Sequence, residues 1–186
     1  MSPTPIALST NSAATVALVA IVLSGLLILA LHVVRPDLEP SWRMLSEYSN
    51  GRHGWMMKAA FWLMAIGNLA LAYALYARAG TGLAKVGIAL HVVVGLALVG
   101  AGAFDMDAIT IKPEMATQEG KLHGLTAMIG VPGQVLAALA LAWGLTRSGQ
   151  VFEGNAFVVL GLAIMALVSL LSMFGYLAFA VSAHGG

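Results

Sequence analysis

Two histidines and an aspartate could together hold a metal ion, although they stand far apart in the sequence. His32, Asp105 and His123 each lie where a long apolar segment begins or ends. Two imidazoles and a carboxylate suit Zn²⁺ or Fe²⁺ with an open coordination position. Such an ion could activate water against a lipid ester. We therefore expect these three residues as metal ligands. The alternative is a hydrogen-bonded network that fixes the loops, because the spacing matches no zinc motif.

Other polar residues near these three would complete a site for catalysis on a lipid or another small amphiphile. Imidazoles and carboxylates can act as general acids and bases. The candidate catalytic residues are His32, Asp107, His123 and Glu47. Arg35 and Arg52 are candidates for binding an anionic head group, since guanidinium groups bind phosphates through paired hydrogen bonds.

A second polar set lies deeper in the apolar segments. Asn68, His91 and Gln134 are each 12 or 13 residues from the segment end that adjoins a long loop. A rise of 1.5 Å per helical residue puts all three about 18–20 Å below that face. They could line a ligand pocket or a proton path, and His91 could bind haem. The alternative is hydrogen bonding between helices, worth about 0.6 kcal/mol per contact.

The composition requires a membrane to surround these residues. Of the 186 residues, 60% are hydrophobic and 9% are charged, and the mean hydropathy is +0.90. Soluble domains have about 25% charged residues. The net charge of +1 and the scattered basic residues exclude a nucleic-acid partner. There is no cysteine, which excludes disulfides and thiolate metal sites.

Five segments have the length of about 20 apolar residues that crossing a bilayer requires. Lipid offers no partner to backbone groups, so each must be a helix. The predicted spans are 13–34, 55–77, 83–104, 122–146 and 156–182. We predict an all-α fold, an integral membrane bundle of five transmembrane helices, with residues 1–186 as a single transmembrane domain.

Five spans place polar residues unequally on two faces. We call the N-terminal side face A and the opposite side face B. Face B has the long loops, 35–54 and 105–121, and all the acidic residues except Glu153. Face A has short loops and a few basic and aromatic residues, namely Arg78, Lys85, Arg147, Tyr73, Tyr76 and Trp143. Aromatic residues at such positions are typical of membrane interfaces.

Three stretches of the sequence resemble the membrane family called DUF998. The first runs from His32 through Arg35-Pro36-Asp37-Leu38-Glu39-Pro40 to Leu45-Ser46-Glu47-Tyr48 and Gly54-Trp55. The others are Phe104-Asp105-Met106-Asp107 and Gly120-Lys121-Leu122-His123-Gly124. The resemblance implies a small polytopic bundle with its motif residues gathered on one face. It implies little chemistry, because the function of this family is undefined. Members commonly have six spans against five here, which implies a side left open for a partner subunit.

These observations lead to two main functional hypotheses. The first is a membrane enzyme that acts on a lipid at face B, with zinc or iron as a candidate cofactor and haem as a less favoured one. The second is a non-catalytic subunit of a larger membrane complex. A channel through the deep polar layer ranks below both, because the helices show no sign of inverted repeats. The expected location is the cell membrane, as a multi-pass protein of the bacterial inner membrane.

Overall fold

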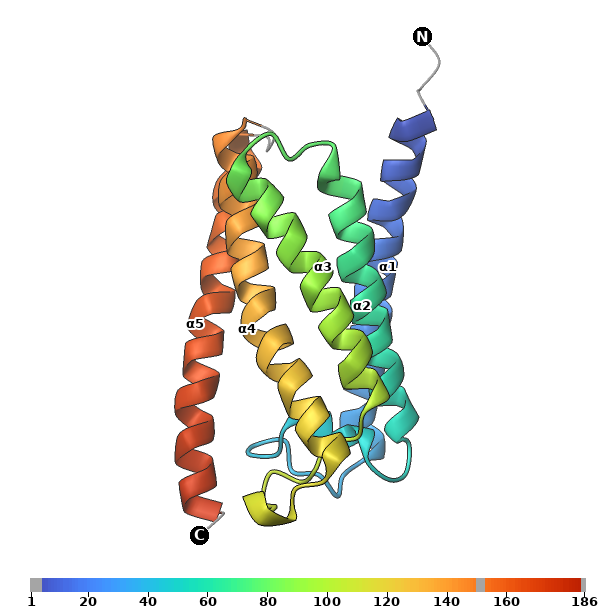
Figure 1. Ribbon diagram of the computed structural model, residues 1–186, viewed down its shortest axis with the longest axis vertical. Helices are drawn as coiled ribbons and strands as arrows, with labels where there is room; N and C mark the ends of the chain where they lie inside the picture. Colours follow the sequence, from blue (N-terminus) through green and yellow to red (C-terminus); the bar gives the residue numbers. More distant parts are fainter. Residues whose placement is uncertain (1–4, 150–152, 185–186) are drawn as a thin grey trace.

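The computed structural model describes residues 5–149 and 153–184, which form five long helices (Figure 1). The helices are α1 (Pro5–Val34), α2 (Gly54–Tyr76), α3 (Gly82–Ala103), α4 (Gln118–Arg147) and α5 (Glu153–His184). Two short 3₁₀ helices, η1 (Leu45–Ser49) and η2 (Pro113–Met115), lie in the long loops of face B. No strand is present in the described residues.

Each of the five helices is long and apolar enough to cross a membrane. The all-α prediction of five transmembrane helices is therefore confirmed, and the chain is a multi-pass membrane protein. The predicted spans of the second and third helices differ from the observed helices by one residue at each end. The other helices extend beyond the predicted spans because turns at the membrane surface remain helical after their apolar residues end.

Helices that follow one another in the sequence also lie next to one another in space. The packed pairs are α1 with α2, α2 with α3, α3 with α4, and α4 with α5. Figure 1 shows α5 at the outer side of the bundle, and α4 and α5 separate toward the end where the chain terminates. Pro132 lies inside α4, where a missing backbone hydrogen bond permits a bend.

Glycine allows α3 and α4 to pack with their backbones nearly in contact. A Cβ atom added at Gly87 would lie 2.6 Å from the Leu141 backbone nitrogen. One added at Gly144 would collide with the backbone of Ala84. Small residues that permit such close approach are a common basis of helix packing in membranes.

The core contains one apolar cluster near each face. Near face A, residues of α2, α3 and α4 pack around Ile88 and Leu141. Near face B, Leu31 of α1 and Met57 of α2 pack with Tyr48 of the first loop. Because the Tyr48 ring is buried among helix residues, the loop that carries it is fixed to the end of the bundle.

Candidate functional site

The first long loop of face B is folded around the buried side chain of Arg35. Its Nη1 donates to the carbonyl oxygens of Asn50, at 2.6 Å, and Arg52, at 3.0 Å. Its Nε and Nη2 donate to the Asp37 carboxylate, with Nη2 2.7 Å from Oδ2. This hydrogen bonding raises the pKa of Arg35 and lowers the pKa of Asp37. Most hydrogen-bond donors of the Arg35 guanidinium are therefore used within its own loop, and few remain for the predicted anionic head group.

Glu47 connects the first loop to the second. Its carboxylate is buried and accepts hydrogen bonds from the Arg43 guanidinium at 2.8 Å, the Met44 backbone nitrogen at 3.3 Å and the Ile109 backbone nitrogen at 3.3 Å. Ile109 belongs to the loop between α3 and α4. The contacts of Glu47, a predicted catalytic residue, are thus all with groups that position the two loops.

A second connection between the loops runs through Met106. The Asn50 side-chain amide donates to the Met106 carbonyl oxygen at 2.6 Å. The Ser46 hydroxyl lies 2.8 Å from the Met106 sulfur. Both loops therefore form one hydrogen-bonded layer across face B.

Asp107 fixes the start of α4. Its two carboxylate oxygens accept hydrogen bonds from the Thr117 backbone nitrogen, at 2.8 Å, and the Thr117 hydroxyl, at 2.9 Å. The same hydroxyl accepts from the Gly120 nitrogen at 2.9 Å. Thr117 is therefore the N-cap of α4. A side chain at position 120 would collide with the Asp107 carboxylate, which explains the glycine there.

Asp105 and Glu119 are the other two carboxylates in this region. Lys58 of α2 forms an ion pair with Asp105 at 2.7 Å, and the Asp105 side chain is 47% exposed. Glu119 accepts a long hydrogen bond of 3.4 Å from the Asp105 backbone nitrogen. Both carboxylates therefore keep oxygen atoms free to accept further hydrogen bonds.

These residues surround a polar hollow at face B with a volume of about 520 Å³. Its walls come from the first loop, the loop after α3 and the first turn of α4. The lining residues are Asn50, Asp105, Met106, Asp107, Ala108, Thr117, Gln118 and Glu119. We refer to this set as the face B hollow.

The two histidines predicted at face B lie in different environments. His32 is exposed, and its Nδ1 donates to the Ile28 carbonyl oxygen at 2.8 Å. His123 is buried, and its Nδ1 donates to the Phe104 carbonyl oxygen at 3.0 Å. A carbonyl can only accept, so Nδ1 carries the hydrogen in both rings. Neither histidine lines the face B hollow.

The predicted metal ligands do not form a shared site. Within residues 5–149 and 153–184, no group of three or more histidine, aspartate or glutamate side chains is placed to hold an ion. His32, Asp105 and His123 all lie in the described part of the chain. His32 and His123 each donate from Nδ1 to a backbone carbonyl, and Asp105 pairs with Lys58.

The deep polar set contains one direct contact. His91 of α3 donates from Nδ1 to the Asn68 side-chain oxygen at 2.7 Å, and the Asn68 amide donates to the Met64 carbonyl at 2.9 Å. Both side chains are buried. Gln134 is half-buried on α4. The Asn68–His91 pair is a hydrogen bond between helices, of the kind expected for polar groups inside a bilayer.

Sequence reasoning missed two residues that matter for the hollow, Asn50 and Lys58. Asn50 precedes Gly51, and an Asn-Gly pair is a signal for a turn. Lys58 lies one turn inside α2, where a cation near the membrane needs a counter-ion. These local signals predict a turn at Asn50 and an acidic partner for Lys58, but they do not identify that partner.

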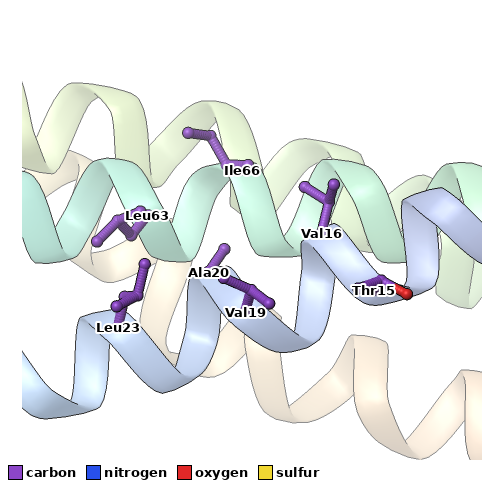
Figure 2. Close-up of a pocket in the computed structure, with 7 residues that line it drawn as sticks. All are labelled: Thr15, Val16, Val19, Ala20, Leu23, Leu63 and Ile66. Carbon is purple, nitrogen blue, oxygen red and sulfur yellow. The ribbon is translucent and has the colours of Figure 1, made fainter.

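A second cavity, shown in Figure 2, is an apolar groove between α1 and α2 with a volume of about 270 Å³. Among the described residues, Thr15 is the only polar one in its lining, and the Thr15 hydroxyl donates to the Asn11 carbonyl. The other lining residues are Val16, Val19, Ala20, Leu23, Leu63 and Ile66. This groove therefore offers packing for hydrocarbon and no group for chemistry.

Comparisons with known proteins agree with the sequence resemblance. Neither the curated proteins nor the solved structures gave a match to this chain. One family model matches, described as a protein of unknown function (DUF998), and it matches residues 16–184. That match includes both long loops, the face B hollow and all or most of every helix. The chain therefore belongs to the DUF998 family.

Proposed function

We propose that this protein binds the polar head group of a lipid or another small amphiphile in the face B hollow. The observation that carries this proposal is the hollow itself. Its volume of about 520 Å³ is within the range of roughly 300–1,000 Å³ that small-molecule sites occupy. It lies where the membrane-spanning helices end, so a ligand there can keep its apolar part in the bilayer.

The lining favours a head group that donates hydrogen bonds. Asp105 and Glu119 have free carboxylate oxygens, and the Asn50 and Gln118 side chains add amide groups. No arginine is among the described residues that line the hollow. An ammonium or hydroxyl group therefore suits this site better than the anionic group expected from the sequence. Hydrogen bonds to a charged acceptor are worth about 1.5–3 kcal/mol.

The loops support binding because they are already ordered. Glu47, Asn50 and Asp107 each hold part of the wall through hydrogen bonds within the protein. A site whose groups are fixed in advance loses less entropy when a ligand binds. Binding is favoured over turnover, because the two histidines expected to transfer protons do not line the hollow.

The test is titration of the detergent-purified protein with short-chain phosphatidylethanolamine, phosphatidylglycerol and phosphatidic acid. We expect phosphatidylethanolamine to bind most tightly and phosphatidic acid most weakly. Glu119→Gln removes a charge from the hollow and should weaken ethanolamine binding about tenfold or more. Glu114→Gln is the matched control, because Glu114 is exposed and does not line the hollow. Equal binding of all three lipids, or equal effects of the two variants, would exclude this function.

The second hypothesis, a subunit of a larger membrane complex, has one observation in its favour. Residues 171–176 of α5 are all exposed, and they form the last part of the membrane span Val158–Tyr176. Ser172 and Tyr176 are among them, and polar side chains inside a bilayer usually face other protein. The mass of the particle in mild detergent tests this hypothesis. A particle that contains a single copy and no other protein would contradict it.

The proposed location is the inner membrane of a bacterium. The five spans support a membrane location.

A further inference from the structure

Face A has three exposed cations at the ends of three helices. Arg78 lies just after α2, Lys85 lies in the first turn of α3, and Arg147 is the last residue of α4. All three side chains are exposed. The proposed head-group site at face B involves none of them.

Contacts between the loops hold these helix ends together. The Thr81 hydroxyl donates to the Gly144 carbonyl oxygen at 3.1 Å, which joins the start of α3 to the end of α4. Gly144 also packs directly on Ala84, the neighbour of Lys85. At Gly80, an added Cβ would lie 3.7 Å from the Ser148 side chain. The segments that carry the three cations are therefore adjacent.

The protein supplies little negative charge to balance these cations. Of the acidic residues of the sequence, Glu153 at the start of α5 is on face A, compared with the three cations there, and the others are on face B. The ion pairs between described residues, formed by Arg35, Arg43 and Lys58, are also on face B. Face A is thus a positively charged surface next to the membrane.

Helix electrostatics explain only part of this arrangement. Arg78 follows the C-terminal end of α2 and Arg147 is the last residue of α4, and at both places the helix dipole favours a cation. Lys85 lies in the first turn of α3, where the dipole disfavours a cation. An anion from outside the protein would account for all three positions.

Aromatic residues place the cations at the level of the lipid head groups. Tyr76 is 73% exposed and Trp143 is 47% exposed. The Arg147 guanidinium lies over the Trp143 ring, 5.4 Å from its centre. Exposed tyrosine and tryptophan at helix ends mark the interface between lipid and water, so Arg147 lies in this interface.

We propose that face A binds an anionic phospholipid, with Arg78, Lys85 and Arg147 around its phosphate. Guanidinium groups bind phosphate oxygens in pairs, and lysine adds a point charge. A lipid is the source of the phosphate because the cations lie beside the bilayer. Each basic residue near an anionic membrane surface strengthens binding roughly fivefold.

The experiment compares lipid retention by native mass spectrometry of the full chain. The protein is purified in detergent and mixed with equal amounts of phosphatidylglycerol and phosphatidylcholine. The test variant is Arg78→Gln, Lys85→Gln, Arg147→Gln. The matched control removes three cations from face B through Arg52→Gln, Lys112→Gln, Lys121→Gln, and none of these residues lines the face B hollow. We expect the wild type and the control to retain phosphatidylglycerol preferentially, and the test variant to lose that preference.

Two results would overturn the proposal. One is equal retention of the two lipids by the wild type. The other is an equal loss of preference in both triple variants, which would indicate attraction by total charge without a local site. If the test variant melts at a lower temperature in phosphatidylcholine alone, Lys85→Gln is compared with Lys112→Gln instead. A preference unchanged by Lys85→Gln then contradicts the proposal.

Discussion

Asn50 and Met106 connect two loops that belong to different helix pairs. The Asn50 side-chain amide donates to the Met106 carbonyl oxygen at 2.6 Å, across 56 positions of sequence. One loop joins α1 to α2, and the other joins α3 to α4. Because Asn50 and Met106 also line the face B hollow, this hydrogen bond sets the distance between two of its walls.

Replacing Asn50 by alanine should weaken ligand binding more than it destabilises the fold. A single hydrogen bond contributes about 1 kcal/mol, so we expect binding of short-chain phosphatidylethanolamine to fall roughly fivefold. The helices do not depend on this contact, and the melting temperature should change little. Asn155→Ala is the control, because Asn155 is exposed on α5. Unchanged binding by Asn50→Ala would show that the hollow does not need this connection.

Glu47→Gln tests whether the buried carboxylate is structural. Glutamine lacks the charge that pairs with Arg43 at 2.8 Å and keeps one acceptor oxygen for the backbone donors of Met44 and Ile109. We expect a loss of about 1.5–3 kcal/mol in the free energy of unfolding, measured by thermal denaturation in detergent. Glu114→Gln, at an exposed position, should have no such effect. A Glu47→Gln protein as stable as wild type would contradict this role and reopen a catalytic one.

The helices could be predicted well because the bilayer imposes a simple rule. Any run of about 20 apolar residues must be helical in lipid, and loops interrupt such runs with charges and prolines. The second span was predicted at 55–77 and is observed as Gly54–Tyr76. The fourth helix starts earlier than predicted, because Thr117 caps a turn that is polar and already outside the membrane.

The site was harder to predict because its contacts join distant parts of the chain. Depth along each helix correctly placed Asn68 and His91 in one layer, where they are hydrogen-bonded. Depth does not determine which way a side chain points around the helix. His32 and His123 lie at similar depth, yet one is exposed and the other is buried against Phe104. The roles of Arg35 and Asp107 depend on backbone groups, which have no signature in the sequence.

Gly87→Ala should destabilise the contact between α3 and α4. The added Cβ would lie 2.6 Å from the Leu141 nitrogen and 2.8 Å from its Cα, and backbone atoms cannot move aside as a side chain can. Overpacking of this kind costs about 1–3 kcal/mol, which thermal denaturation would detect. Gly25→Ala is the control, because nothing lies within 4 Å of an added Cβ there. It should be neutral or slightly stabilising, since alanine favours helices. Equal effects of the two changes would mean that α3 and α4 are not in such close contact.

The ion pair between Arg35 and Asp37 predicts how the first loop responds to acid. The hydrogen bond from Arg35 lowers the pKa of Asp37 below its ordinary value of 3.8. A carboxyl group whose pKa is lower in the folded state than in the unfolded state stabilises the folded state. This stabilisation is complete above the unfolded-state pKa, and it is lost as the pH falls through the folded-state pKa. Asp37→Asn should therefore lower the melting temperature at pH 7, and the difference from wild type should shrink below about pH 4. Because the Asp37 side chain is 60% exposed, water and salt screen the pair, so the effect should be small and weaker in high salt. A difference between the two proteins that stays constant from pH 7 to below pH 4 would mean that the carboxylate charge is not what holds the loop.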